Sequence, residues 1–437
     1  MMAAMSLAAP GVVALPADAL IDRELVRAWL AWGFVWLLVF PTLGAVVVVK
    51  FPDPGFLDEV PWLSFGRLLP VHVNGVIWGA FSTLFIGLAH YLVPRLCGAR
   101  LWQERWSRPL LWVWNLNVGV GSLLLLLGSN RGWEVGEYPL ATVIVLLLVL
   151  LALTVQFLAT IGRRTEPTLY VSLWYLMAAF VWTDVNLVLL ILGPLSIPGI
   201  SNAAWHGLFI HSIVGLWITP AGYVLVYYFL PASVRAPISS HALALVGFWS
   251  LALFYPLVGI HAYLDVPIAE WARTTAFVSS ILLVVPVWTV LQNVFGTVSA
   301  SVALRRNLPA KLLITGSLVY LGGCLQSTVE ALRVLQPPTH FTDFVVAHPE
   351  VTIVGTFVLW ALAGVLYVWP RITGAPGGRL LLATCGYWLV TLGVGTMFVV
   401  LAVRGAPQDF IRAPTGVAIG VGLSFIVLHL ARSARRG

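Results

Sequence analysis

The stretch PLATVIVLLLVLLALTVQFLATIG (139–162) has no charged side chain in twenty-four residues. An apolar helix of about twenty residues crosses the hydrocarbon layer of a bilayer, which is about 30 Å thick. A helix is the expected form because it satisfies its own backbone hydrogen-bonding groups where water is absent. This segment alone predicts an integral membrane protein.

Comparable apolar runs extend over the rest of the 437 residues, of which 60% are hydrophobic and 9% are charged. Such a chain has too little polar surface to coat a water-soluble globule. We expect an all-α polytopic transmembrane bundle of about twelve helices, forming one membrane domain over 27–437 after a cytoplasmic tail over 1–26. The predicted spans are 28–50, 69–94, 109–128, 139–162, 168–194, 203–231, 242–263, 273–299, 311–336, 348–370, 380–403 and 413–432.

The net charge of +7 is dispersed over short loops, which disfavours nucleic acid as a partner and favours membrane lipid. Basic side chains occupy alternate connections, and acidic side chains occupy the connections between them. Because cytoplasmic loops are enriched in Lys and Arg, we expect a multi-pass protein of the cell inner membrane with both termini cytoplasmic. The basic residues include Arg95, Arg163, Arg235, Arg306 and Arg371, and the acidic ones include Asp53, Glu134, Asp265 and Asp409. The first residues lack a basic region, so we expect no cleaved signal peptide.

The three cysteines, Cys97, Cys324 and Cys385, form neither a CxxC nor a CxxCH motif. This spacing argues against a disulfide framework, a thiolate metal site and a covalently attached c-type haem. Any haem in this chain must therefore be held by other ligands.

Four histidines fall at a similar depth in the predicted bundle, near the outer side of four different helices. They are His72, His211, His261 and His348. Polar side chains are costly in lipid and tend to mark functional interiors. Neutral imidazole is a common axial ligand of haem iron and a good ligand for copper. The pattern therefore predicts a redox cofactor site inside the bundle.

Three carboxylates, Asp184, Glu330 and Glu350, also fall within or at the ends of predicted spans. Acids in such positions indicate proton handling, or contacts to a metal or to haem propionates. For Glu330 the alternative is an ordinary helical ion pair with Arg333, three residues further along.

Several motifs resemble the catalytic subunit of C-type haem-copper oxidases, a family related to the bacterial nitric oxide reductases, and the likeness covers most of the chain. The motifs are FGRLLPVHVNGVIWGAF (65–81), FIHSIVG (209–215), YYFLP (227–231), GIHAYLDVPIAEWA (259–272) and HFTDFVVAHPEVTIVG (340–355). The resemblance implies two b-type haems and a copper ion, or non-haem iron in place of copper.

The resemblance also implies a role for individual residues. His72 matches an axial ligand of the low-spin haem, and His348 matches the proximal ligand of the high-spin haem. His211 and His261 match ligands of the copper site. Residues His340 and Asp343 match positions near the haem propionates, and Tyr320 matches the tyrosine that becomes crosslinked to a copper-ligating histidine.

Two positions depart from the family pattern. Residues two apart on a helix point about 200° apart, so an HxH pair presents one ligand to each of two haems. Here the pair reads His348-Pro-Glu350, and Ala262 replaces the histidine that neighbours His261. The low-spin iron would then be five-coordinate or weakly ligated by Glu350. The copper site could hold Cu(I) on two imidazoles, or gain an oxygen from Tyr263 or Asp265, which would favour iron.

The leading hypothesis is a membrane oxidoreductase of respiratory electron transfer that reduces O2 to water at a haem–metal centre. A cytochrome c-type subunit, a soluble cytochrome c or quinol would supply the electrons. The alternatives are an enzyme that reduces nitric oxide with non-haem iron, and a non-catalytic haem-binding descendant such as a subunit, sensor or assembly factor. A transporter is disfavoured because the matching motifs fall at cofactor-binding positions.

Overall fold

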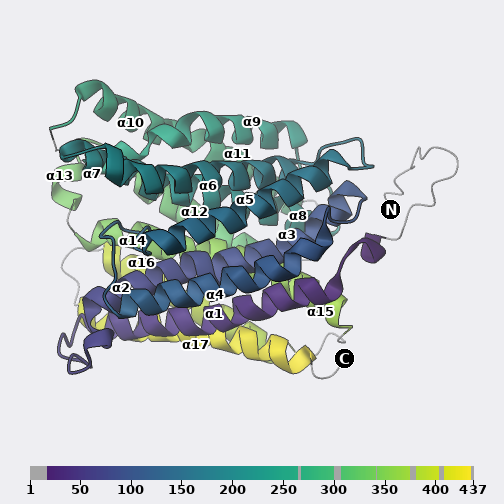
Figure 1. Ribbon diagram of the computed structural model, residues 1–437, viewed down its shortest axis with the longest axis horizontal. Helices are drawn as coiled ribbons and strands as arrows, with labels where there is room; N and C mark the ends of the chain where they lie inside the picture. Colours follow the sequence, from purple (N-terminus) through teal and green to yellow (C-terminus); the bar gives the residue numbers. More distant parts are fainter. Residues whose placement is uncertain are drawn as a thin grey trace, which may run out of the picture.

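The computed structural model describes residues 17–263, 267–299, 307–340, 342–374, 380–402 and 408–434. Throughout these ranges the chain forms helices and no β-strand. Eleven helices are long and apolar enough to cross a membrane, and a twelfth apolar helix, His241–Leu257, is shorter. The expectation of an all-α transmembrane bundle of about twelve helices is confirmed (Figure 1).

Three of the spanning helices are composite, because a π-helical turn joins two α-helical parts. The first runs from α2 (Phe65–Asn74) through Gly75–Phe81 to α3 (Ser82–Cys97). The second runs from α7 (Ile200–Ile213) through Val214–Ile218 to α8 (Thr219–Val234). The third runs from α14 (Asp343–Thr352) through Ile353–Val358 to α15 (Leu359–Thr373).

The remaining α-helices surround these three. They are α1 (Arg23–Val49), α4 (Ser107–Leu126), α5 (Leu140–Gly162), α6 (Val171–Ser196), α9 (His241–Phe254), α10 (Glu270–Leu282), α11 (Val284–Ser299), α12 (Leu308–Glu330), α13 (Gln336–Thr339), α16 (Leu381–Ala402) and α17 (Gln408–Ala434). Short 3-10 turns lie at Ala17–Leu20, Pro61–Leu63, Glu104–Trp106, Tyr255–Leu257 and Gly259–Tyr263.

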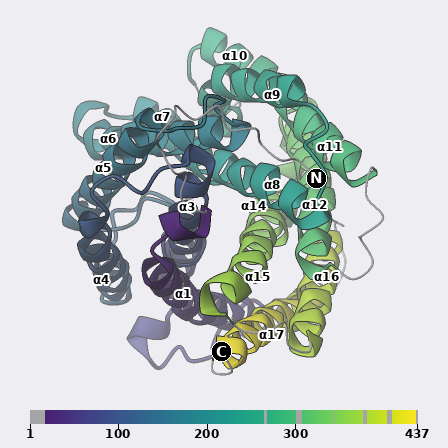
Figure 2. The same cartoon turned by 90° about the vertical axis from the view of Figure 1, so that its right-hand side faces the viewer.

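Burial separates the composite helices from the others. In their most apolar windows, 100%, 89% and 83% of the residues are buried, compared with 33–56% in the other spanning helices. Figure 2 shows α3, α8 and α15 toward the middle of the bundle. The other parts of the same composite helices carry the histidines, His72 on α2, His211 on α7 and His348 on α14, so the histidine-bearing segments belong to the most buried spans.

Each π-helical turn begins a few residues after one of these histidines, at Gly75, Val214 and Ile353. A π-turn inserts a residue into the helical register and re-aims the side chains on either side of it, and such turns are frequent at functional sites. Their recurrence on all three buried helices marks one level of the bundle as specialised.

The outer surface is apolar. Large side chains on the peripheral helices are widely exposed, for example Leu116 (68%), Leu148 (59%) and Leu392 (62%). In water this exposure would be unfavourable, whereas lipid tails accept it without cost. The protein is therefore a multi-pass membrane protein.

The beginning of α1 and the end of α17 lie at the same end of the bundle (Figure 1), which agrees with an even number of crossings.

The predicted span 242–263 is less regular than expected. Its α-helix ends at Phe254 because Pro256 follows, and proline lacks the backbone N–H that would continue the helix. The span expected over 273–299 consists of two helices, α10 and α11, that meet at Leu283. Residues 1–16 of the expected tail lie outside the described residues.

Candidate metal and cofactor centre

The structure brings His211 of α7 together with His261 of the Gly259–Tyr263 turn. Their ring centroids are 4.3 Å apart, and the ring planes are inclined at 69°. Two glycines permit this approach, because a Cβ on Gly207 would lie 2.9 Å from the carbonyl oxygen of Gly259. Two imidazoles from segments that are fifty residues apart in the sequence therefore lie in contact inside the bundle.

Hydrogen bonding assigns the tautomer of His261. Its Nδ1 lies 2.9 Å from Ser280 Oγ, and that hydroxyl donates to the carbonyl of Ala276 at 2.8 Å. Since the Ser280 proton is used, His261 Nδ1–H is the donor, and Nε2 keeps its lone pair. Metal-ligating histidines have this arrangement, in which a hydrogen bond from one nitrogen orients the other.

His348 of α14 has the same arrangement. Its Nδ1 donates to the carbonyl of Gly323 on α12 at 2.9 Å, which leaves Nε2 as a free lone pair. The three rings are close enough that His348 interacts electrostatically with both His211 and His261. Three of the four predicted ligands thus gather at one place.

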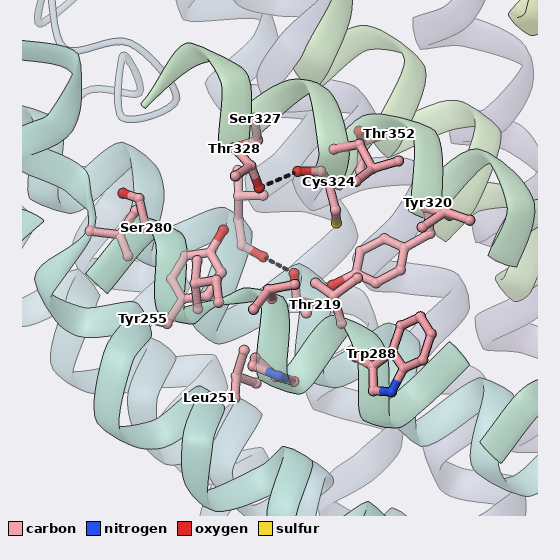
Figure 3. A pocket seen from close by; sticks show the side chains of 18 of the residues that line it. Thr219, Leu251, Tyr255, Ser280, Trp288, Tyr320, Cys324, Ser327, Thr328 and Thr352 are labelled. Atoms are coloured by element: carbon pink, nitrogen blue, oxygen red, sulfur yellow. Dashed lines mark hydrogen bonds between the residues drawn. The ribbon is translucent and has the colours of Figure 1, made fainter. Parts of the chain in front are cut away.

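A cavity of about 240 Å³ opens beside His348. Its wall includes Tyr255, Ser280, Tyr320, Cys324 and Thr352, several of which Figure 3 shows around the open space. The hydroxyl of Thr352 is buried and has no hydrogen-bond partner among the described residues. The other residues of the wall are mostly apolar, so the cavity offers only a few polar atoms to a bound group.

Tyr320 lines this cavity. Its hydroxyl lies 2.8 Å from that of Tyr223, so the two form a buried pair. A second tyrosine, Tyr255, also lines the cavity, and its ring occupies the space that a side chain at Gly215 would need. We had not singled out Tyr255 from the sequence. The available signal was its position six residues before His261 on the same segment.

The fourth predicted ligand, His72 of α2, lies in a separate seat against α1. Its Nδ1 donates to the carbonyl of Phe40 on α1 at 2.8 Å, which again leaves Nε2 free. The ring packs directly on Gly44, where a Cβ would lie 2.8 Å from Nε2 and closer still to the two neighbouring ring atoms. His72 is only half-buried, although its helix is the most buried span.

Glu350 and Asp343 both form an ion pair with the same arginine, which no sequence pattern had singled out. Arg412 of α17 places its two terminal nitrogens 3.3 Å from Asp343 Oδ1 and 3.3 Å from Glu350 Oε1. His340 ends the short helix α13 just before α14, with its backbone N–H bonded to Gln336.

The expected helical pair between Glu330 and Arg333 is wrong. Helix α12 ends at Glu330, so Arg333 lies beyond the helical register and instead pairs with Glu270 at 2.9 Å. Glu330 accepts a hydrogen bond from Gln326. The third carboxylate, Asp184, contacts Thr154 of α5, with 2.7 Å between their oxygens.

The donor set around the His211–His261 pair is small. Within the described ranges no group of three or more His, Cys, Asp or Glu side chains is close enough to hold a metal. Asp265, one expected oxygen donor, lies outside the described residues. The other, Tyr263, packs its ring against Gly207, one helical turn before His211. Among the described residues, the pair therefore offers a metal two imidazole nitrogens.

A further carboxylate, Glu137, lies in the connection before α5 and is only 7% exposed. It accepts a hydrogen bond from Asn74, two residues after His72, with 2.6 Å between the atoms. Burial raises the pKa of Glu137 to about 7, more than its hydrogen bonds lower it. The sequence predicts that Glu134 and Glu137 share an acidic outer loop. It does not predict that Glu137 is buried while Glu134 is exposed.

The profile of the family described as Cytochrome C and Quinol oxidase polypeptide I matches residues 24–431. The chain belongs to this family. Among relatives of this oxidase chain, the cbb3-type cytochrome c oxidase subunit CcoN1 of Stutzerimonas stutzeri is 26% identical over 401 residues, which cover 88% of this chain and 83% of the relative. The cytochrome c oxidase subunit 1 homolog of Agrobacterium tumefaciens is 28% identical over 400 residues, with 88% and 72% covered.

The fold agrees with this assignment. A chain of a heme-copper terminal oxidase dimer, solved by cryo-electron microscopy, superposes with a TM-score of 0.78 at 15% identity and covers 94% of this chain and 84% of its own. The oxidase family generally binds haems and copper. The imidazoles described here suit such groups, because three of them keep a free Nε2 whose ring is held by a hydrogen bond at Nδ1.

Proposed function

We propose that this oxidase-family chain is a catalytic subunit that reduces O2 to water at a haem–metal centre. The observation that carries the proposal is the contact between the rings of His211 and His261, together with His348, which interacts electrostatically with both and lines a mostly apolar cavity. Imidazoles from three segments at one level are the donors that a haem iron and a facing copper ion require.

In this proposal His348 is the ligand of the haem at which oxygen reacts, while His211 and His261 hold copper. When bound, the haem and copper supply the electrons and the open metal positions that O2 reduction needs. Gly323 orients His348 and Ser280 orients His261, each through a hydrogen bond at Nδ1. The protein contributes rigid donors and a site that excludes bulk water.

Protons must also reach the cavity, because each oxygen atom takes up two protons as it becomes water. Tyr320 supports this role because its hydroxyl faces the cavity and is hydrogen-bonded to Tyr223. A hydroxyl pair of this kind can pass a proton along its hydrogen bond and hold it at the Tyr320 oxygen. Tyr255 is a second candidate because it lines the same cavity beside the segment that carries His261.

We assign His72 to a second b-type haem that receives electrons on the way to the cavity. Its seat supports the assignment because the ring is fixed by a hydrogen bond to Phe40 and fits closely on Gly44. The motifs that would attach c-type haem are absent from this sequence, so the donor is a cytochrome c-type subunit, a soluble cytochrome c, or quinol.

We also propose that the protein lies in the inner membrane with both termini in the cytoplasm. The three composite helices have Arg95 in the last turn of α3, Arg235 as the capping residue of α8 and Arg371 in the last turn of α15. Lys and Arg are retained on the cytoplasmic side of bacterial membranes. Single cysteines introduced beside Arg235 and beside Glu134 would be labelled from opposite sides of the membrane if this orientation is correct.

The purified protein tests the function directly. We expect two haems and one copper per chain, with O2 consumption driven by reduced cytochrome c or by quinol. The variant His261→Ala should lose copper and O2 turnover while it keeps both haems. Full turnover by this variant would contradict the proposed centre.

Two alternatives predict other results. An NO-reducing enzyme would contain non-haem iron and consume NO, and Asp265 would have to supply the missing oxygen ligand, because the described residues place no carboxylate with the histidine pair. A non-catalytic haem protein is favoured by the same small donor set and by Ala262. It would contain haem but no copper and would turn over neither gas.

A further inference from the structure

Arg412 is the most deeply buried charged side chain near the two proposed haem seats. Only 3% of it is exposed, and its guanidinium carbon lies 3.8 Å from the centroid of the Phe51 ring. Its two terminal nitrogens contact Asp343 and Glu350, each at 3.3 Å. These acids are seven residues apart on α14, which places them on one face of the helix. Arg412 thus connects that face of α14 to α17.

This arrangement restricts what Glu350 can do. A guanidinium cannot lose its proton in a protein, so a buried arginine requires anionic partners. Moving the Glu350 carboxylate onto a metal would leave Asp343 to balance the charge of Arg412, but it would take the acceptor from the second terminal nitrogen of a side chain that is almost fully buried. The ion pair therefore competes directly with iron ligation by Glu350.

The competition between the ion pair and iron ligation concerns the haem that we assign to His72. Positions 348 and 350 point about 200° apart on α14, so Glu350 faces away from the cavity of His348. Glu350 is close enough to His72 for the two groups to interact electrostatically. His72 offers one oriented nitrogen, whereas the nearby Glu350 carboxylate is already held by Arg412.

We propose that Arg412 keeps Glu350 as its counter-ion, so that a haem held by His72 has a single protein ligand and an open iron position. This inference rests on the proposed function, because it requires a haem at His72. A haem iron with one protein ligand binds a small diatomic gas at the opposite position. The chain would accordingly have two gas-binding haems, one on His72 and one on His348.

Carbon monoxide titration of the reduced, purified protein tests this, with the haem content counted separately after extraction. We expect two haems and two bound CO per chain. The variant Glu350→His places an imidazole at the open position, so it should keep two haems but bind one CO and gain a low-spin spectrum. Asp58→Asn is the matched control, because it removes the acidic partner of a different buried cation, Lys50, and should still bind two CO.

The possible results distinguish a failure of this inference from a failure of the proposed function. Two haems with only one CO in the wild-type protein would overturn the inference, because His72 iron would then have a second ligand. One haem per chain would overturn it as well, because the His72 seat would not bind haem. A preparation with no haem at all would instead refute the proposed function, and this inference with it.

Discussion

The substitution Gly44→Ala should remove the haem at His72 and leave the one at His348. A Cβ on residue 44 would lie 2.8 Å from His72 Nε2 and nearer to two other ring atoms, whereas carbon atoms pack at about 3.5–4.0 Å. The ring must therefore retreat by about 1 Å or more. Metal–ligand distances tolerate only about 0.2 Å, so the imidazole can no longer reach its iron.

The retreat also strains the 2.8 Å hydrogen bond from His72 to Phe40, which fixes the ring. Overpacking of this kind destabilises a folded protein by about 1–3 kcal/mol, so the variant should remain folded. Haem extraction and optical spectra of the purified variant measure the effect. We expect the haem content to fall from two to one per chain.

Gly395→Ala is the matched control, because no atom lies within 4 Å of a Cβ at that position. It should keep both haems. Two haems with an unchanged spectrum in Gly44→Ala would refute the assignment of His72 as a ligand, since a displaced ring cannot hold its iron.

Three other predictions concern single residues. Ser280→Ala removes the hydrogen bond that orients His261, so copper affinity measured by chelator competition should fall about 10–100-fold. Tyr320→Phe removes a cavity hydroxyl, so O2 turnover should fall at least about tenfold while haem content stays constant. The buried Glu137 binds its proton more tightly in the folded state, so the folded state loses stability as pH rises from about 5 to about 8. In Glu137→Gln this loss, of the order of 3 kcal/mol, should disappear from thermal unfolding curves recorded across that range.

Two of these predictions have a control in the same chain, and the third has an alternative residue. Ser250→Ala alters a serine that bonds only to backbone carbonyls of its own helix, so copper affinity should not change. Glu134→Gln alters an exposed acid three residues from Glu137 and should keep the wild-type pH dependence. Unchanged turnover in Tyr320→Phe would transfer the proton-donating role to Tyr255, and Tyr255→Phe would then be the inactive variant.

Much of the fold was predictable because lipid imposes a simple rule on the sequence. Uncharged runs such as 140–162 become helices, and the alternation of basic and acidic connections orders them. The same reasoning placed His211, His261 and His348 at one level, and the structure brings them together. Depth along a helix can be read from residue number, which is why this part of the site was accessible.

The rest depends on contacts between distant segments. Arg412 lies 62 residues from Glu350 in the sequence, and no local pattern predicts that they meet. The incorrect ion pair between Glu330 and Arg333 has a related cause. The stretch that contains both residues has no proline, so nothing in it indicated that α12 ends at Glu330. The π-helical turns were also missed, because they change the helical register without a change in hydrophobic pattern.

Infrared spectroscopy of the carbon monoxide complex at cryogenic temperature tests the central claim most directly. If His348 holds an iron that faces copper on His211 and His261, light should release CO from iron and the CO should bind copper, giving a copper-carbonyl band. That band should be absent from His261→Ala. A wild-type spectrum in which released CO remains unbound, with no copper-carbonyl band, would contradict the proposed haem–metal centre.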